Sequence, residues 1–162
     1  MEDGDSRLDG PLLEVMKTAF EQWLIFVGLQ GSRDRGEGIA ESDIDVVVVL
    51  DRLTMADLET YRIIPAELPE REKLCGFVSG REEVACWDTS DLFQFYHDTT
   101  AYLGSLDFLL PRISEASIRR AVHLGACNLY HACCHNYIHE RNSEILKGCY
   151  KSAFLSCGRS IS

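Results

Sequence analysis

Residues Gly28 to Asp51 read GLQGSRDRGEGIAESDIDVVVVLD. The stretch holds a glycine-serine pair, a hydrophilic loop, and two aspartates separated by one isoleucine at the start of four consecutive valines. A short apolar, β-branched run bounded by polar residues is typical of a buried strand. We therefore predict one strand over residues 44–50 and another over LIFVGL at 24–29, which ends just before Gly31 and Ser32.

The two aspartates have a spacing that suits a metal site. Side chains two residues apart on a strand point to the same side, so Asp43 and Asp45 project together while Ile44 faces the core. Neighbouring carboxylates repel each other unless a cation lies between them, and oxygen ligands with open positions suit Mg²⁺ that carries a nucleoside triphosphate. We predict Asp43 and Asp45 as metal ligands.

The glycine-serine pair is a candidate phosphate-binding turn. Gly31 allows the backbone to approach a phosphate, and the Ser32 hydroxyl and the amides that follow can donate to phosphate oxygens, with charge from Arg33 or Arg35. Alone, this pair is only a turn and Asp-x-Asp only a strand entrance. Their order beside two predicted strands favours one shared site, with residues 36–42 as the connection.

The segment GSRDRGEGIAESDIDVVVV resembles the signature of the nucleotidyltransferase superfamily typified by DNA polymerase β, in the version found in aminoglycoside and minimal nucleotidyltransferases. The resemblance implies an α/β (α+β) fold in which helices flank a small mixed β-sheet. The residues that match the motif are Gly31, Ser32, Arg33, Gly36, Ser42, Asp43 and Asp45.

The resemblance also implies an activity, the transfer of a nucleoside monophosphate from an NTP to a hydroxyl of a small acceptor, such as an aminoglycoside, with release of pyrophosphate. In this two-metal scheme Asp43 and Asp45 hold Mg²⁺ and are catalytic. The nucleotide-binding residues it implies are Gly31, Ser32, Arg33 and Ser42.

Members of this superfamily usually add a third carboxylate on a later strand. The next predicted strand, LCGFVS at 74–79, contains no acid, while Glu82 and Glu83 follow it and Asp107 lies close to Pro111. None of them is assigned the role. One tightly bound metal, a replaced ligand, or a nucleotide-binding protein that does not transfer all stay open.

Other segments complete the expected organisation. Helical spacing of apolar residues predicts a helix over 11–23, Thr54 can cap a short helix over 54–61, and LFQFYH at 92–97 reads as a strand or as a short helix beneath the sheet. Ser114 begins a predicted long helix to about residue 138 or 139, and a last helix runs from Asn142 or Ser143 to Leu155. We expect a nucleotidyltransferase domain over 1–110 and a helical segment over 111–162.

The last predicted helix carries an apolar face with little chain left to cover it. The face packs on the α/β part, or pairs with another chain as in a homodimer through the C-terminal helices, or belongs to a chain shorter than its relatives.

The long helix carries a candidate general base. The second half resembles, more faintly, the helical domain of the aminoglycoside enzymes, in which a carboxylate on the first long helix takes the proton of the sugar hydroxyl. His135 falls near that position, with Glu140 as the alternative. A zinc site from Cys127, His131 and His135 is a weaker hypothesis than a face of histidines that packs against its surroundings.

Composition narrows the partners. The 162 residues carry a formal net charge of -10, which disfavours nucleic acid and allows a cationic acceptor or a metal-neutralised nucleotide. The acidic N-terminus is unlike a secretory signal, no segment has the length of a membrane span, and seven cysteines without a framework favour the cytoplasm. The rival function is a non-catalytic nucleotide-binding or partner-binding module, such as the antitoxin half of a toxin-antitoxin pair.

Overall fold

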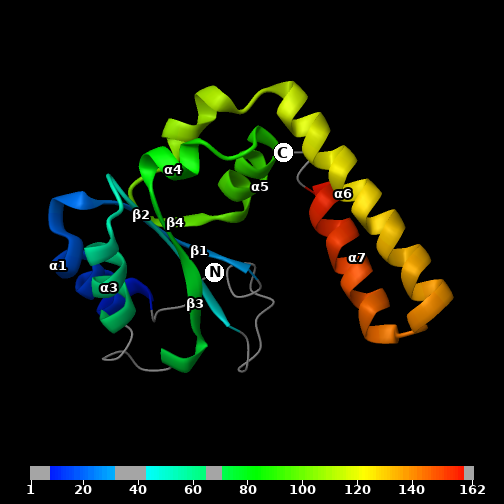
Figure 1. Ribbon diagram of the computed structural model, residues 1–162, viewed down its shortest axis with the longest axis horizontal. Helices are drawn as coiled ribbons and strands as arrows, with labels where there is room; N and C mark the ends of the chain where they lie inside the picture. Colours follow the sequence, from blue (N-terminus) through cyan, green and yellow to red (C-terminus); the bar gives the residue numbers. More distant parts are fainter. Residues whose placement is uncertain (1–7, 32–42, 65–70, 159–162) are drawn as a thin grey trace. The chain divides into compact units, whose positions relative to one another are not determined.

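The computed structural model describes residues 8–31, 43–64 and 71–158 (Figure 1). The chain divides into two compact units. The first comprises residues 1–87 and 98–110, and the second comprises 88–97 and 111–162. No helix within the described ranges is long and apolar enough to cross a membrane.

The first unit is built on a four-stranded mixed sheet with the strand order β3-β2-β1-β4. The central strand β2 is antiparallel to β1 and parallel to β3, and β4 adds to β1 in antiparallel orientation. The predicted mixed sheet and its strands at 24–29, 44–50 and 74–79 are confirmed. The strand bounds are Leu24–Gln30 for β1, Ile44–Leu50 for β2, Leu74–Gly80 for β3 and Thr100–Leu103 for β4.

The valine run is buried on both faces of the sheet. Val46 and Val48 lie in one core cluster together with Met16 of the first helix, while Val47 and Val49, which point the other way, are also at most 1% exposed. A strand covered on both sides needs apolar residues at every position, which explains the unbroken run.

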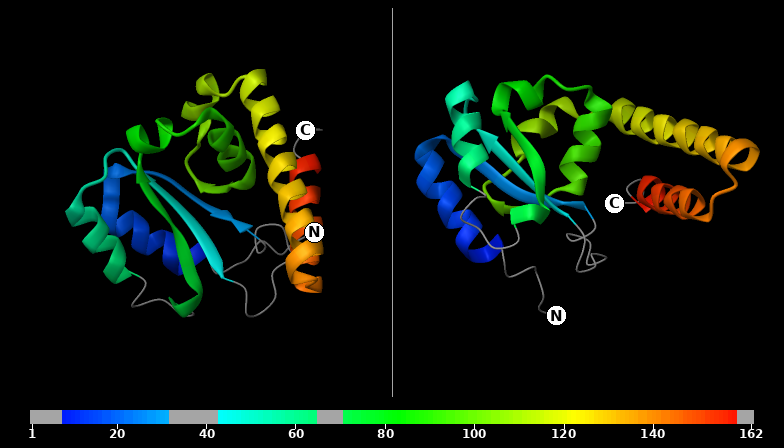
Figure 2. Two further views of the ribbon diagram at one scale, coloured as in Figure 1. Left: turned by 45° about the vertical axis from the view of Figure 1, so that its right-hand side comes forward. Right: turned by 60° about the horizontal axis from the view of Figure 1, so that its bottom comes forward.

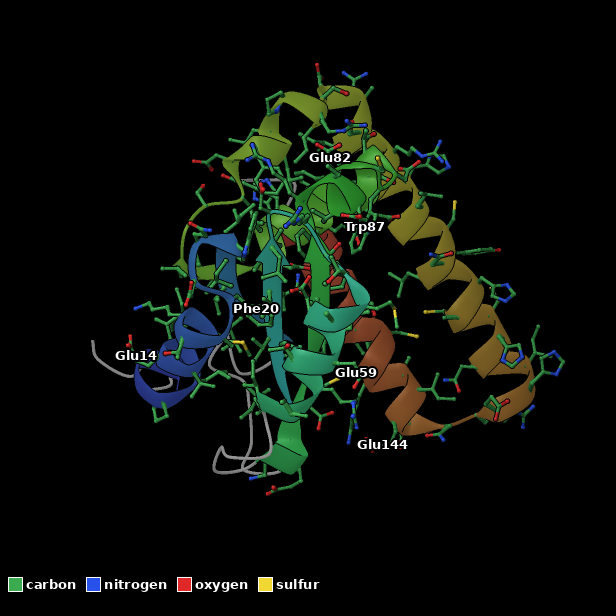
Figure 3. All side chains as sticks on the ribbon, turned by 60° about the vertical axis from the view of Figure 1, so that its left-hand side comes forward. Glu14, Phe20, Glu59, Glu82, Trp87 and Glu144 are labelled. Carbon is green, nitrogen blue, oxygen red and sulfur yellow. The ribbon has the colours of Figure 1, made fainter. Side chains whose placement is uncertain are left out.

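Helices α1 (Leu13–Phe20) and α3 (Met55–Ile63) cover the same face of the sheet (Figures 1 and 2). A π-helical turn, Leu8–Leu12, precedes α1, and a 3-10 turn, Glu21–Trp23, follows it, so the predicted helix is regular only in its middle. Figure 3 shows Phe20 on the sheet side of α1 and Glu14 on the outer side.

Helix α3 begins as the sequence predicts. The Thr54 hydroxyl accepts a hydrogen bond from the Asp57 backbone N–H, and the Asp57 carboxylate accepts one from the Thr54 N–H at 2.8 Å. This reciprocal cap satisfies two of the N–H groups that a helix start leaves without partners. The helix connects β2 to the 3-10 turn Arg71–Lys73, which leads into the parallel strand β3.

Four elements differ from the prediction or were not predicted. LFQFYH is part of helix α5 (Thr89–Asp98), so its interpretation as a strand was wrong and the helical alternative was right. The Asp88 carboxylate accepts a hydrogen bond from the Ser90 N–H at 2.9 Å and so favours a helix start there. The short strand β4 and the 3-10 segment Asp107–Arg112 were not predicted. Helix α4, Arg81–Ala85, directly follows β3.

The second unit contains α5 and a helical hairpin of α6 (Glu115–His135) and α7 (Ser143–Gly158), which lie side by side (Figures 1 and 2). Ser114 caps α6 as predicted. At the turn, the buried Asn136 side chain donates to the Asn142 carbonyl and accepts from its N–H, at 3.1 and 3.0 Å. These two bonds close the hairpin after the π-helical turn Asn136–Glu140.

The partly buried Tyr61 of α3 gives the first unit a testable response to alkaline pH. Burial raises the pKa of Tyr61 to about 12, and charge on Cys75 adds to the shift. Between pH 10 and 12 the unfolded chain ionises this tyrosine while the folded chain keeps it neutral, so the free energy of unfolding falls as pH rises. The loss attributable to Tyr61 is on the order of 2 to 3 kcal/mol.

Urea unfolding at several pH values in this range measures the effect. Tyr61→Phe should show a shallower decline in stability than the unchanged protein. Tyr150→Phe, which alters a side chain that is 71% exposed, should keep the original decline. Equal slopes for all three proteins would contradict the prediction.

Candidate functional site

The end of β1 lies beside the start of β2. Gln30, the last residue of β1, pairs with Asp45 in the antiparallel register. Gly31 follows with a φ of 85°, a conformation that favours glycine. A Cβ atom on Gly31 would overlap a carboxylate oxygen of Asp45. The structure therefore places the predicted turn glycine directly against one of the two predicted metal ligands.

The two aspartates take alternate positions at the start of β2. Asp43 directly precedes the strand and is exposed, while Asp45 is partly buried within it. Ile44, between them, is 5% exposed and belongs to the core cluster on the α1 side. Alternation along the strand directs Asp45 to the opposite face, while the direction of Asp43, which precedes the strand, stays a prediction.

Asp45 is the middle residue of a row that crosses three strands. It pairs with Gln30 on β1 and with Cys75 on β3, and directly paired residues project from the same face of a sheet. The Gln30 amide donates to Thr99 Oγ1 at 2.7 Å, which fixes that end of the row. Cys75 is exposed and has the place nearest to Asp45 on the other side.

The acids considered as a third carboxylate lie elsewhere. Gly80 pairs with Leu50, so α4, which carries Glu82 and Glu83, begins beside the end of β2 opposite to Asp45. Figure 3 labels Glu82, which lies on α4. Asp107 is exposed in the 3-10 segment that follows β4. The residue that the sheet places beside Asp45 is Cys75, which sequence reasoning missed.

The two carboxylates are the predicted ligands of a divalent cation. Across the described ranges, no group of three or more His, Cys, Asp and Glu side chains could hold a metal ion. The oxygen donors of Asp43 and Asp45, beside the Gly31 backbone, fit a divalent cation that completes its shell with phosphate oxygens and water, as Mg²⁺ does. The donor chemistry therefore suits a cation that arrives with a nucleotide.

Several predicted site residues lie outside the described residues. They are Ser32, Arg33, Gly36 and Ser42. Their nucleotide-binding roles stay predictions.

His135, the predicted general base, belongs to the second unit. It is the last residue of α6, it is exposed, and its ring centroid lies 4.9 Å from that of His139 and 6.2 Å from that of His131. The alternative base, Glu140, is exposed at the end of the π-helical turn. The zinc hypothesis gains no support, because Cys127, His131 and His135 form no metal-holding group in this described helix. The choice of base stays a prediction.

Comparison with known proteins agrees with this geometry. A scan against protein families matches residues 12–92 to the nucleotidyltransferase domain, which is half of the chain and includes β1, β2, β3 and both aspartates. The chain belongs to the nucleotidyltransferase superfamily, and the minimal nucleotidyltransferase type fits it. A search of curated proteins finds no match.

The contact between Gly31 and Asp45 predicts the effect of one added methyl group. Gly31→Ala should lower the free energy of unfolding by about 1 to 3 kcal/mol, because alanine is strained at positive φ and its Cβ meets the Asp45 carboxylate.

Urea unfolding measures this change. Gly148→Ala is the matched control, since Gly148 lies within α7 and its Cβ would meet nothing within 4 Å. That control should raise stability by about 0.5 to 1 kcal/mol. A Gly31→Ala protein as stable as the unchanged one would show that the turn does not have the described conformation.

Proposed function

We propose that this protein is a Mg²⁺-dependent nucleotidyltransferase that transfers a nucleoside monophosphate from an NTP to a hydroxyl of a small acceptor. The observation that carries the proposal is that the Asp45 carboxylate lies where a Cβ atom on Gly31 would be. It joins a phosphate-compatible turn to a carboxylate pair in a chain of this superfamily.

In this proposal, the residues at the end of β1 and at the start of β2 bind different parts of the nucleotide. The absence of a side chain at Gly31 leaves room for the Asp45 carboxylate beside the turn, so the turn and the carboxylate could serve one triphosphate. Asp43 and Asp45 would hold Mg²⁺, which, when bound, neutralises phosphate charge and makes the α-phosphorus easier to attack. Ser32, Arg33 and Ser42 add donors and charge in this scheme.

The proposed reaction is a displacement at the α-phosphorus. The acceptor oxygen forms a bond to that phosphorus, the bond to the oxygen that bridges to the β-phosphate breaks, and pyrophosphate leaves. A general base would take the hydroxyl proton, and the candidates that the resemblance to the aminoglycoside enzymes implies are His135 and Glu140.

Charge supports the choice of acceptor. The chain carries 26 acidic against 16 basic residues, a balance that attracts a cationic small molecule, such as an aminoglycoside, and repels a nucleic acid. The odd number of cysteines, seven, supports a reducing cytoplasm as the location.

The helical hairpin supports a homodimer. It exposes several large apolar side chains, which association with a second copy would cover. Sedimentation velocity would test this part of the proposal. The exposed side chains are Leu124, Tyr130, Tyr137, Ile138, Ile145, Leu146 and Tyr150.

One observation favours a second candidate function. The position beside Asp45 on β3 carries Cys75 and not a carboxylate. Two carboxylates hold Mg²⁺ more weakly than three, so the chain could bind an NTP without transferring it, as a partner-binding module does. Binding of NTP without pyrophosphate release across a panel of acceptors would support this candidate.

The aspartate pair gives the decisive test of the leading proposal. Asp43→Asn and Asp45→Asn should each lower the rate of pyrophosphate release by at least about 100-fold, the scale of one lost electrostatic contact to a transition state. They should also weaken Mg²⁺-dependent NTP binding in isothermal titration.

Asp51→Asn is the matched control because Asp51 is exposed just beyond the opposite end of β2. It should leave both measurements unchanged. Transfer that survives loss of either paired aspartate, or no binding of any NTP with Mg²⁺ by the unchanged protein, would overturn the proposal.

A further inference from the structure

A cavity lies within the second unit, between α5 and the helical hairpin. Its volume is about 640 Å³, which is within the range of small-molecule sites. Residues of α5, α6 and α7 line it, and all three helices belong to the second unit. Arg120 Nη2 of α6 lies 3.4 Å from Asp88 Oδ2, just before α5, and this ion pair links α5 to the hairpin.

The hairpin supplies the apolar part of the cavity. Leu124 and Leu129 of α6 and Ile145 of α7 line it, and Leu124 and Ile145 are 42% and 38% exposed. Gly148 of α7 also lines it, and a Cβ atom there would meet nothing within 4 Å. Apolar side chains that border a concave, open site suit a ligand with an apolar face.

Polar side chains border the same cavity, and most of them come from α5. Asp91 and Gln94 of α5 and Asn128 of α6 line it. Within the described ranges, none of these three side chains has a hydrogen-bond or ion-pair partner in the protein. Ser90 differs, because its hydroxyl donates to the Asp88 carboxylate. One carboxylate and two amides are therefore available to a ligand.

We propose that this cavity binds a small hydroxylated amine, such as an amino sugar. The Asp91 carboxylate pairs with the ammonium group and is the one charged side chain among the lining residues that the structure describes. The amides of Gln94 and Asn128 both donate and accept, as hydroxyl groups require. The C–H face of a sugar ring packs against Leu124 and Ile145.

Binding in this cavity goes beyond the proposed function, because it needs neither NTP nor Mg²⁺. The groups that bind the amine belong to the second unit, whereas Asp43 and Asp45 belong to the first. The chemistry of the ligand matches that of the proposed cationic acceptor. The bound amine is therefore either that acceptor or a separate ligand, and the experiment below distinguishes them.

A ligand-observed NMR titration of the full chain, without nucleotide, tests the proposal. The probes are neamine, a two-ring amino sugar, and trehalose, an uncharged two-ring sugar. Neamine should bind at least about fivefold more tightly, because trehalose has no ammonium group to pair with a carboxylate. No binding of neamine, or equal affinities for both sugars, would overturn the proposal.

A charge variant separates the cavity from general attraction to an acidic protein. Asp91→Asn should weaken neamine binding about fivefold or more and leave trehalose binding unchanged. The matched control is Glu115→Gln, since Glu115 is an exposed acid at the start of α6 that does not line the cavity. It should bind neamine like the unchanged protein. Equal neamine affinities for Asp91→Asn and the unchanged protein would contradict the role of Asp91.

A steric variant tests the position of the ligand. Gly148→Leu places a side chain in the open space at the cavity and should weaken binding of neamine at least about tenfold. Leucine favours a helix more than glycine does, so α7 should stay folded, which circular dichroism checks. Neamine binding that survives in a folded Gly148→Leu protein would overturn the proposal.

The two proposals fail in different ways. Pyrophosphate release from an NTP without binding of neamine supports the function and overturns the amine site. Binding of neamine that depends on Asp91, without binding of any NTP, supports the amine site and overturns the function. Where both hold, transfer to neamine identifies the bound amine as the acceptor, and binding without transfer identifies it as a separate ligand. Either result supports the amine site.

Discussion

The pairing of β1 with β2 is the constraint on which the site depends. Because Gln30 opposes Asp45, the residue that follows β1 must lie beside the carboxylate at the start of β2. A slip of one residue would turn Asp45 towards Met16 and the α1 core and would move Val46 and Val48 to the other face. The burial of the valines thus fixes the geometry of the carboxylate pair.

Carboxylate repulsion and valine burial together explain why β2 remains stable with two aspartates at its start. Carboxylates on alternate residues lie about 6 to 7 Å apart, so their repulsion is roughly 0.6 to 2.8 kcal/mol, according to how much water surrounds them. Burial of each valine contributes about 1.5 kcal/mol or more, and four of them lie at positions 46–49 with at most 1% exposure. The free energy gained by burying the valines is larger than the repulsion between the carboxylates. A bound cation would remove that repulsion.

Local signals in the sequence predicted the elements that carry the site. They did not predict how distant segments pair with each other. The β-branched run marks β2, and Thr54 with Asp57 marks the start of α3. Nothing local shows that β3 pairs with β2 in the register that sets Cys75 beside Asp45, because parallel strands meet only through a long connection. Strand β4 has four residues at a sheet edge, two of them exposed, and so has no apolar run to detect. In α5 the alternation of Phe93 and Phe95 imitates a strand, and the Asp88 cap decides for a helix.

A thiol in place of a carboxylate changes the electrostatics of the site as well as its ligands. A triphosphate brings several negative charges to a protein whose net charge is already -10. A third carboxylate beside Asp43 and Asp45 would hold Mg²⁺ more firmly but would repel a nucleotide that arrives without it. Under the proposed function, binding of the nucleotide would therefore depend on the cation that it carries.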